Sequence, residues 1–249
     1  MKKILITIII LVVILLLILL FLFLQPVKVP VLTYHDFSYE ESSDMVINQE
    51  EFEKEMKYLA NHHYHSLDLS EMECFMKKKC SIPKKSVLIT MDDGWINELE
   101  IAAPILKKYN LKAVIFYIGE HLDDENPNFM HREDLERLKL EYPNIEIASH
   151  SYSLHFEDAY QLSFDEFIVD MDLMKEEIPS SYYAYPYGRG SDTYSEALEK
   201  SGYKLAFTFG PDKEHRKASQ QDSIYRVPRL NMSNGMPFWK FVLRLHWYR

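Results

Sequence analysis

Residues 87–95 read VLITMDDGW, an apolar run that ends in two adjacent aspartates and a glycine. A short apolar run of this kind is typical of a buried strand, so the two carboxylates are expected at its C-terminal end. A second apolar run, IEIAS at residues 145–149, leads directly into His150, and His155 follows five positions later. Because parallel strands end at one edge of a sheet or barrel, we expect the carboxylates and imidazoles to meet there.

These side chains are the components of a metal site with hydrolytic chemistry. One aspartate and two histidines provide three ligands, and the other aspartate is then available as a base. Oxygen and nitrogen ligands without a thiolate suit zinc or another divalent first-row ion, and three protein ligands leave positions for water and substrate. Taken singly, an Asp-Asp-Gly after a strand often forms only a turn or a helix N-cap. The occurrence of both sets directly after strand-like runs favours the metal site.

At these residues the chain resembles the polysaccharide deacetylases, the family-four carbohydrate esterases that contain a NodB homology domain. The resemblance rests on TMDDG at residues 90–94, on the histidine pair, on VLTYHDF at residues 31–37 and on YAYPYG at residues 183–188. It covers about residues 29–232. The histidine spacing, one residue longer than is usual, and the last two motifs are similar to the branch that deacetylates poly-N-acetylglucosamine.

The resemblance implies a role for each of these side chains. Asp92 is the general base, and Asp93, His150 and His155 bind a divalent metal ion, for which we favour Zn²⁺. The ion would acidify a bound water and polarise the acetamide carbonyl. The backbone N–H of Tyr187 would bind the oxyanion, although the ring of this residue could instead form a sugar platform or pack in the core.

The general acid that protonates the leaving amine has two candidates. In the poly-N-acetylglucosamine branch the motif order resembles a circular permutation, which assigns the role to His35, at the end of an apolar strand. The ordinary order uses a C-terminal Leu-x-His motif, for which LRLH at residues 243–246 is a near match. We expect His35 to be the acid and His246 to be dispensable; a buried core histidine is the alternative for His35.

One element of the family pattern is missing. Many members place an arginine shortly before the Pro-Tyr pair to orient the base, and residues 182–185, YYAY, contain none. Arg226 or Arg229 could substitute, but for both we favour a structural salt bridge. The sequence therefore leaves the partner of the base open.

The N-terminus predicts a membrane anchor. Two lysines precede an unbroken apolar run from Ile4 to Leu24 in which Thr7 is the only polar side chain, and as a helix this run is about 31 Å long. A cleaved signal peptide would have a shorter apolar region and small residues at its cleavage site, which the following segment lacks. We expect residues 1–25 to be an uncleaved, single-pass signal anchor in the cell membrane, with the deacetylase domain, residues 26–249, outside the cell.

Composition limits the partners. The formal net charge is −10, and no stripe of lysine and arginine is present, which argues against a nucleic-acid partner. The length suits one domain, and an N-acetylglucosamine-containing polysaccharide is the expected partner besides the membrane. Cys74 and Cys80 could pair outside the cell, but we favour free thiols. The oligomeric state is not predicted.

Strand and helix patterns alternate along the chain, which implies parallel strands with helical crossovers. The predicted class is α/β, with a distorted or incomplete (β/α) barrel of the NodB type that follows the membrane helix. The predicted strands are residues 29–35, 87–93, 113–118, 145–150, 182–187, 204–208 and 225–230. The predicted helices are residues 49–61, a segment starting at Ser70 with Glu73, residues 97–109 and 132–140, a segment that Ser163 and Glu166 cap and that runs to about residue 177, and residues 192–201.

Three functions compete. We favour metal-dependent N-deacetylation of an extracellular poly-N-acetylglucosamine-like exopolysaccharide. The same chemistry on peptidoglycan or chitin oligomers is the first alternative, because no residue excludes it. The second is a membrane-tethered glycan-binding protein with weak or no turnover. The complete aspartate and histidine sets argue against this last function, whereas the missing arginine keeps it open.

Overall fold

The structure is a computed structural model of the chain, and it describes residues 2–24, 26–39, 45–208, 216–232 and 236–246. Within these ranges, the main element is a nine-stranded sheet in which every pairing is parallel. Its strands are β1 (Val31–Tyr34), β4 (His65–Ser66), β5 (Ser86–Asp93), β6 (Ala113–Tyr117), β7 (Ile145–Ser149), β8 (Tyr182–Ala184), β9 (Leu205–Thr208), β10 (Val227–Pro228) and β11 (Leu230–Asn231). A second, two-stranded sheet pairs β2 (Asp36–Ser38) with β3 (Val46–Asn48).

The sheet curls because its two outermost strands belong to one short segment. β10 pairs with β9 at one edge, β11 pairs with β1 at the other, and only Arg229 separates them. The backbone N–H of Arg229 donates to the carbonyl of Thr208 at 3.0 Å, and that of Met232 donates to the carbonyl of Thr33 at 2.9 Å. Residues 227–231 therefore join the two edges, and the predicted (β/α) barrel is confirmed as a nearly closed parallel barrel.

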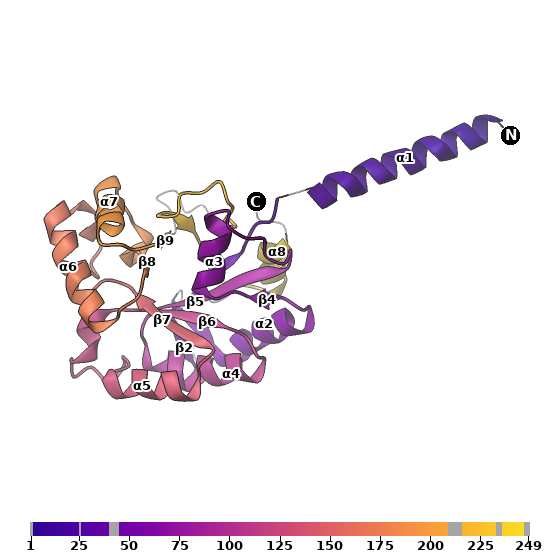
Figure 1. The fold of residues 1–249 in the computed structure, drawn as a ribbon. Coiled ribbons are helices and arrows are strands. Elements are labelled where there is room, and N and C mark those ends of the chain that lie inside the picture. Colours follow the sequence, from indigo (N-terminus) through magenta and orange to yellow (C-terminus); the bar gives the residue numbers. More distant parts are fainter. Residues whose placement is uncertain (1, 25, 40–44, 209–215, 233–235, 247–249) are drawn as a thin grey trace.

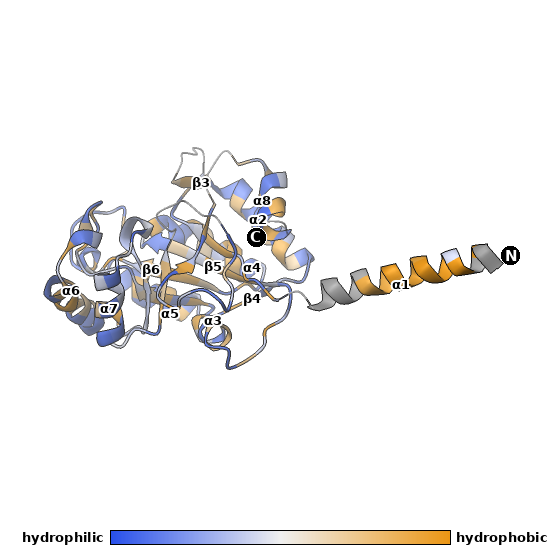
Figure 2. Ribbon diagram, turned by 90° about the horizontal axis from the view of Figure 1, so that it is seen from above, coloured by the Kyte–Doolittle hydropathy of each residue, from blue (hydrophilic) through white to orange (hydrophobic). Residues whose placement is uncertain are grey.

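Helices cover the outside of this barrel. The α-helices of the described residues are α1 (Lys2–Leu24), α2 (Gln49–Asn61), α3 (Leu69–Met76), α4 (Ala103–Lys108), α5 (Arg132–Glu141), α6 (Phe164–Glu177), α7 (Asp192–Lys200) and α8 (Phe238–His246). In Figure 1, α2, α4 and α5 lie along one side of the sheet, and α6 and α7 lie together at one end. Figure 2 shows hydrophobic colour along α1 and on the central strands of the barrel, and more hydrophilic colour on the helices around the barrel.

Local signals place most of these elements. The predicted cap of α6 is confirmed, because Ser163 and Glu166 form a reciprocal capping box. The predicted cap of α3 is wrong: Asp68, in an extended conformation, accepts the backbone N–H of Glu71, and Ser70 already lies inside the first turn. β5 is buried at every position, because the barrel interior lies on one face and helices cover the other.

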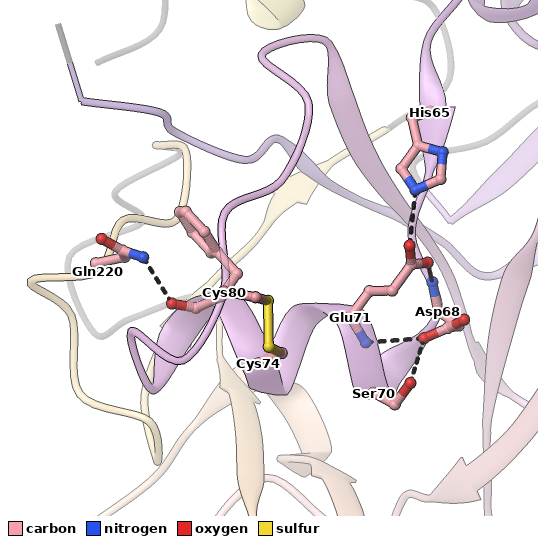
Figure 3. The surroundings of a disulfide bond; sticks show 8 residues. His65, Asp68, Ser70, Glu71, Cys74, Cys80 and Gln220 are labelled. Carbon is pink, nitrogen blue, oxygen red and sulfur yellow. Dashed lines mark hydrogen bonds and ion pairs between the residues drawn. A yellow bond between two sulfur atoms is a disulfide. The ribbon is translucent and has the colours of Figure 1, made fainter. Parts of the chain in front are cut away.

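The two cysteines form a disulfide, so the expectation of free thiols is wrong. Cys74 lies in α3, and Cys80 lies in the segment that follows (Figure 3). The helix ends at Met76, and a left-handed residue, Lys78, with φ 57°, turns the chain back so that the two Cα atoms are 5.5 Å apart. A spacing of six residues does not reveal such a turn. In the same view, Gln220 donates its side-chain amide to the carbonyl of Phe75 at 2.9 Å.

The N-terminal helix α1 projects away from the barrel in Figures 1 and 2. Among the residues that the structure describes, no helix combines the length and the apolar character needed to cross a membrane. The membrane anchor therefore stays a prediction.

A buried polar cluster links β1, α2 and α8. Tyr34 donates its hydroxyl to Oε2 of Glu55 at 2.7 Å, and both side chains are buried. Burial raises the pKa of Glu55 to about 8, although the hydrogen bond from Tyr34 and the charge of Arg244 lower it in part. The folded protein therefore holds a proton on Glu55 over a pH range in which the unfolded chain has released it.

This proton makes stability depend on pH. Because the folded-state pKa of Glu55 is raised, its stabilising contribution is complete below about pH 4.5 and is lost as the pH rises to about 8. We therefore compare the free energy of unfolding of the wild type with that of Glu55→Gln. Across this pH window the wild type should lose stability relative to the variant. The loss should be about 1.4 kcal/mol for each unit by which the pKa of Glu55 differs between the folded and unfolded states. Chemical denaturation at several pH values measures it, with Glu50→Gln, an exposed residue of the same helix, as control. A difference that does not change with pH would contradict the assignment.

Candidate metal centre and active site

The predicted site residues gather at the C-terminal ends of the barrel strands. Asp92 and Asp93 end β5, His150 directly follows β7, and His35 directly follows β1. Tyr187 lies in the short 3₁₀ turn after β8. In barrels of this kind the strand ends build the active site, because loops of different length and chemistry converge there on a rigid frame. The structure thus brings together residues that are far apart in sequence.

The three proposed metal ligands form one cluster. A carboxylate oxygen of Asp93 and one nitrogen each of His150 and His155 all lie within 4.8 Å of one another. Oδ1 of Asp93 is 3.4 Å from Nε2 of His150 and 3.2 Å from Nε2 of His155. Asp93 and His150 are buried and His155 is partly exposed, so the cluster opens to solvent on one side.

The hydrogen bonds of this cluster fit a divalent cation. Nδ1 of His150 lies 2.8 Å from the carbonyl of Ala184, and since a carbonyl only accepts, this nitrogen carries the proton. In a neutral His150, Nε2 then has no proton, and its lone pair faces a carboxylate oxygen of Asp93. Oδ1 of Asp93 is buried and accepts no hydrogen bond from the described residues. Facing lone pairs of this kind repel each other unless a cation lies between them, so these residues suit zinc or a similar ion.

Charge in the cluster also favours a bound cation. Burial opposes ionisation of Asp93, but His150, His155 and His35 hold its pKa well below the usual value, so it is a carboxylate. Burial opposes protonation of His155, but the Asp93 carboxylate outweighs it and raises the pKa of this imidazole. A metal ion would replace that proton, since ligand histidines must be neutral.

Unusual backbone conformations aim these ligands. Asp93 and Gly94 have φ values of 87° and 90°, and a Cβ on Gly94 would lie 2.3 Å from the ring of Tyr117. Glycine is therefore required there both for its conformation and for space. The residue after His150, Ser151, has φ 76°. Asp-Asp-Gly is thus a tight turn as well as part of the proposed metal site.

Asp170 on α6 supports the loop between the two histidines, and it was not predicted as a site residue. Its carboxylate accepts the backbone N–H groups of Tyr152 and Ser153 at 3.0 and 2.8 Å. These bonds hold the segment between the two histidines. A signal was present, because Asp170 lies within the buried stripe of α6, next to Met171, where a carboxylate requires partners.

Asp92 does not face the two histidines at hydrogen-bonding distance; it pairs with Arg229. Both carboxylate oxygens accept guanidinium N–H groups at 2.7 Å, and the exposed fractions of the side chains are 1% for Asp92 and 0% for Arg229. Burial alone would raise the pKa of Asp92, but Arg229, His150 and His35 together hold it below the usual value. Asp92 is therefore an ionised carboxylate with a fixed orientation.

Arg229 does form the salt bridge that was favoured for it, and its partner is Asp92, the residue predicted to be the base. The pair is buried, so this arginine is in a position to orient the carboxylate in place of the arginine that is missing before the Pro-Tyr pair. For Arg226 the preference is confirmed: its guanidinium pairs with Asp192 at 2.6 Å on the surface.

The structure separates the two candidate acids. Nε2 of His35 lies 3.9 Å from Oδ2 of Asp92, and the residue is 8% exposed. Burial lowers the pKa of His35, although Asp92 and Asp93 act in the opposite direction. His246 lies at the end of α8, where Nε2 is 3.2 Å from the hydroxyl of Tyr58. His35 is thus the candidate that the fold places beside the carboxylates.

Tyr187 lies at the open side of the cluster. Its exposed fraction is 51%, which excludes packing in the core, and its ring stacks on His155 with centroids 5.0 Å apart. Its φ of 55° is left-handed, a conformation that is uncommon for tyrosine and that accumulates at functional sites. Both remaining roles, oxyanion binding by its N–H and a sugar platform by its ring, are compatible with this position.

Comparison with known proteins identifies the family. The family described as polysaccharide deacetylase matches residues 79–206. Over 215 residues the chain is 29% identical to the poly-beta-1,6-N-acetyl-D-glucosamine N-deacetylase of Staphylococcus aureus (strain MSSA476), covering 81% of this chain and 72% of that protein. The chain belongs to the polysaccharide deacetylase family, which confirms the predicted class of enzyme, a hydrolytic N-deacetylase.

Solved structures share the fold. The structure of IcaB from Ammonifex degensii is 25% identical and has a TM-score of 0.70, covering 84% of this chain and 94% of that one. The Streptococcus pyogenes deacetylase PplD, determined in complex with acetate, is 22% identical and has a TM-score of 0.78, covering 89% and 99%. The barrel is therefore that of known deacetylases.

The Arg229 pair gives a test of the site by stability. Arg229→Met leaves the buried Asp92 carboxylate without its cation, so we expect the free energy of unfolding at pH 7 to fall by about 3–5 kcal/mol. Adding Asp92→Asn removes the buried charge, so the double variant should recover part of this loss. Arg226→Met, on the surface, should change stability by less than about 0.5 kcal/mol. Equal losses for the two arginines would contradict a buried, charge-holding role for Arg229.

Proposed function

We propose that this protein is a metal-dependent N-deacetylase that acts outside the cell on a poly-N-acetylglucosamine-like exopolysaccharide. The observation that carries the proposal is the division of work between two adjacent carboxylates. Asp93 faces two imidazoles as a ligand would, whereas Asp92 is held by Arg229 and faces His35 as a base would. Pairs of titratable groups in contrasting environments are the mark of acid and base catalysis.

The chain's own residues account for the proton transfers. A divalent ion held by Asp93, His150 and His155 would lower the pKa of a bound water toward about 7 and polarise the acetamide carbonyl. Asp92 would take the proton as the water attacks, and the N–H of Tyr187 would donate to the oxyanion. As the C–N bond breaks, protonated His35 would give its proton to the leaving amine. The products are acetate and a glucosamine residue.

Two observations support this substrate class. The S. aureus relative is named for poly-beta-1,6-N-acetyl-D-glucosamine. In addition, the permuted motif order assigns the acid role to His35, which directly follows β1 and lies beside Asp92. The missing arginine is what keeps open a glycan-binding protein without turnover, and the pairing of Arg229 with Asp92 weighs against that alternative.

Acetate release from defined glycans tests the proposal. We expect more acetate to be released from poly-beta-1,6-N-acetylglucosamine than from peptidoglycan or from chitin oligomers. A chelator should abolish this release. Asp92→Asn should lose about 10²- to 10⁴-fold in turnover, because it removes the general base. Acetate release from peptidoglycan or chitin oligomers alone would show that the proposed substrate class is wrong. Glycan binding without any acetate would contradict the enzymatic proposal as a whole.

Substrates with different leaving groups can identify the residue that acts as the general acid. An amide needs protonation of its amine, whereas an activated acetyl ester has a good leaving group and needs little. We therefore expect His35→Ala to depress turnover of the glycan amide far more than turnover of an activated ester. His246→Ala is the matched control and should be nearly silent in both assays. Loss in His246→Ala with full activity in His35→Ala would restore the ordinary motif order.

We also propose that residues 1–25 anchor the enzyme in the cell membrane with the barrel outside. The apolar run from Ile4 to Leu24 and the two preceding lysines support this orientation. The Cys74–Cys80 disulfide agrees with an oxidising compartment. The protein should stay with membranes after a salt wash, and protease added to intact cells should digest the barrel. A shortened, soluble product in the medium would show a cleaved signal peptide instead.

A further inference from the structure

The carboxylate of Asp93 is shared between two environments. Oδ1 faces the imidazoles of His150 and His155, whereas Oδ2 accepts the indole N–H of Trp95 at 3.1 Å. A carboxylate can rotate about its Cβ–Cγ bond, and a hydrogen bond to one oxygen limits this rotation. The indole therefore helps to decide which oxygen faces the imidazoles.

A neighbouring aromatic ring holds the indole in place. The ring of Phe129 lies against Trp95, with centroids 4.4 Å apart and an interplanar angle of 31°. His121 stacks on the same Phe129 ring with centroids 3.6 Å apart and an angle of 7°. Three rings therefore lie in a row that ends at the proposed metal ligand.

Backbone hydrogen bonds attach this row to the Asp-Asp-Gly turn. Trp95 and Phe129 form an isolated antiparallel bridge. On either side of it, Ile96 donates to the carbonyl of Asn128 and Met130 donates to the carbonyl of Gly94, each at 2.8 Å. The turn that carries Asp93 and the segment that carries Phe129 thus form one short ladder.

The far end of the row is held by a shared carboxylate. One oxygen of Asp124 lies 2.6 Å from Nδ1 of His121, and the other lies 3.2 Å from Nε2 of His131. The backbone N–H of Asn126 also donates to Asp124 at 2.9 Å. Asp124 therefore ties together the two ends of the segment from His121 to His131.

We propose that Trp95 is a positioning residue for the metal ligand Asp93, and that the segment from His121 to His131 holds Trp95 in place. This inference rests on the proposed metal site. Groups that hydrogen-bond to metal ligands orient them before the ion arrives, and their removal typically weakens metal binding about 10- to 100-fold. The segment thereby sets the affinity of a site to which it contributes no ligand.

The effect on metal affinity can be measured without substrate. The full-length chain is stripped with a chelator and titrated with Zn²⁺ alone. Trp95→Phe keeps a ring against Phe129 but loses the N–H, and we expect it to weaken binding at least about 10-fold. Trp239→Phe is the matched control, because Trp239 is exposed on α8, and it should bind as the wild type does. Equal affinity of Trp95→Phe and wild type would overturn the inference.

Variants in the segment test its part in the same assay. Asp124→Asn weakens the tie to both histidines and should also lower Zn²⁺ affinity. Asp123→Asn changes the neighbouring exposed carboxylate, which pairs with Arg132 at 2.7 Å, and should not. If Asp124→Asn and Asp123→Asn have the same affinity as the wild type, the segment has no positioning role.

Two further measurements separate positioning from folding and from substrate binding. The thermal midpoint of metal-free Trp95→Phe should stay close to that of the metal-free wild type, and the visible absorption of its Co²⁺ complex should differ from that of the wild-type complex. If only KM for the glycan rises while Zn²⁺ affinity and the Co²⁺ spectrum are unchanged, Trp95 is a sugar contact and the inference fails. A wild type that binds no metal would instead remove the proposed function.

Discussion

The ion pair between Arg229 and Asp92 lies where the barrel closes. Residues 227–231 reach β9 with one half and β1 with the other, and Arg229 is the single residue between them. From this position its guanidinium forms two hydrogen bonds with Asp92. An ionised carboxylate so deeply buried is unfavourable without such a partner. The segment that completes the barrel therefore also supplies the charge that keeps the proposed base ionised.

A turn of the backbone at Asp93 lets two adjacent carboxylates reach the same end of the barrel. Neighbouring side chains of a regular strand point to opposite faces. Asp93 departs from this geometry with a φ of 87°, so its carboxylate meets the imidazoles at the mouth of the barrel while Asp92 meets Arg229. A tight turn enforced by Gly94 thus gives one short motif two chemical environments.

What could be predicted from the sequence was largely local. Apolar runs such as residues 145–149 identified the strands, and their ends identified Asp92, Asp93 and His150, because parallel strands deliver their last residues to one place. The family resemblance assigned a role to each of these residues and pointed to His35, which directly follows β1. The alternation of elements was sufficient for the barrel class.

What the sequence did not reveal depends on contacts between distant residues or on single backbone angles. Arg229 is 137 positions from Asp92, and no local pattern distinguishes it from Arg226, whose partner is on the surface. The disulfide depends on the left-handed turn at Lys78. The strands β2 and β3 and the helix α8 were not predicted, and the two strands are only three residues long.

Metal content distinguishes the proposed ligands from the proposed base. We expect one divalent ion per chain in the wild type and in Asp92→Asn, because Asp92 is not a ligand. We expect loss of that ion in His150→Ala and in His155→Ala, each measured by elemental analysis on protein equilibrated with Zn²⁺. Full occupancy in both histidine variants, or loss in Asp92→Asn alone, would contradict the assignment of Asp93, His150 and His155 as the ligands.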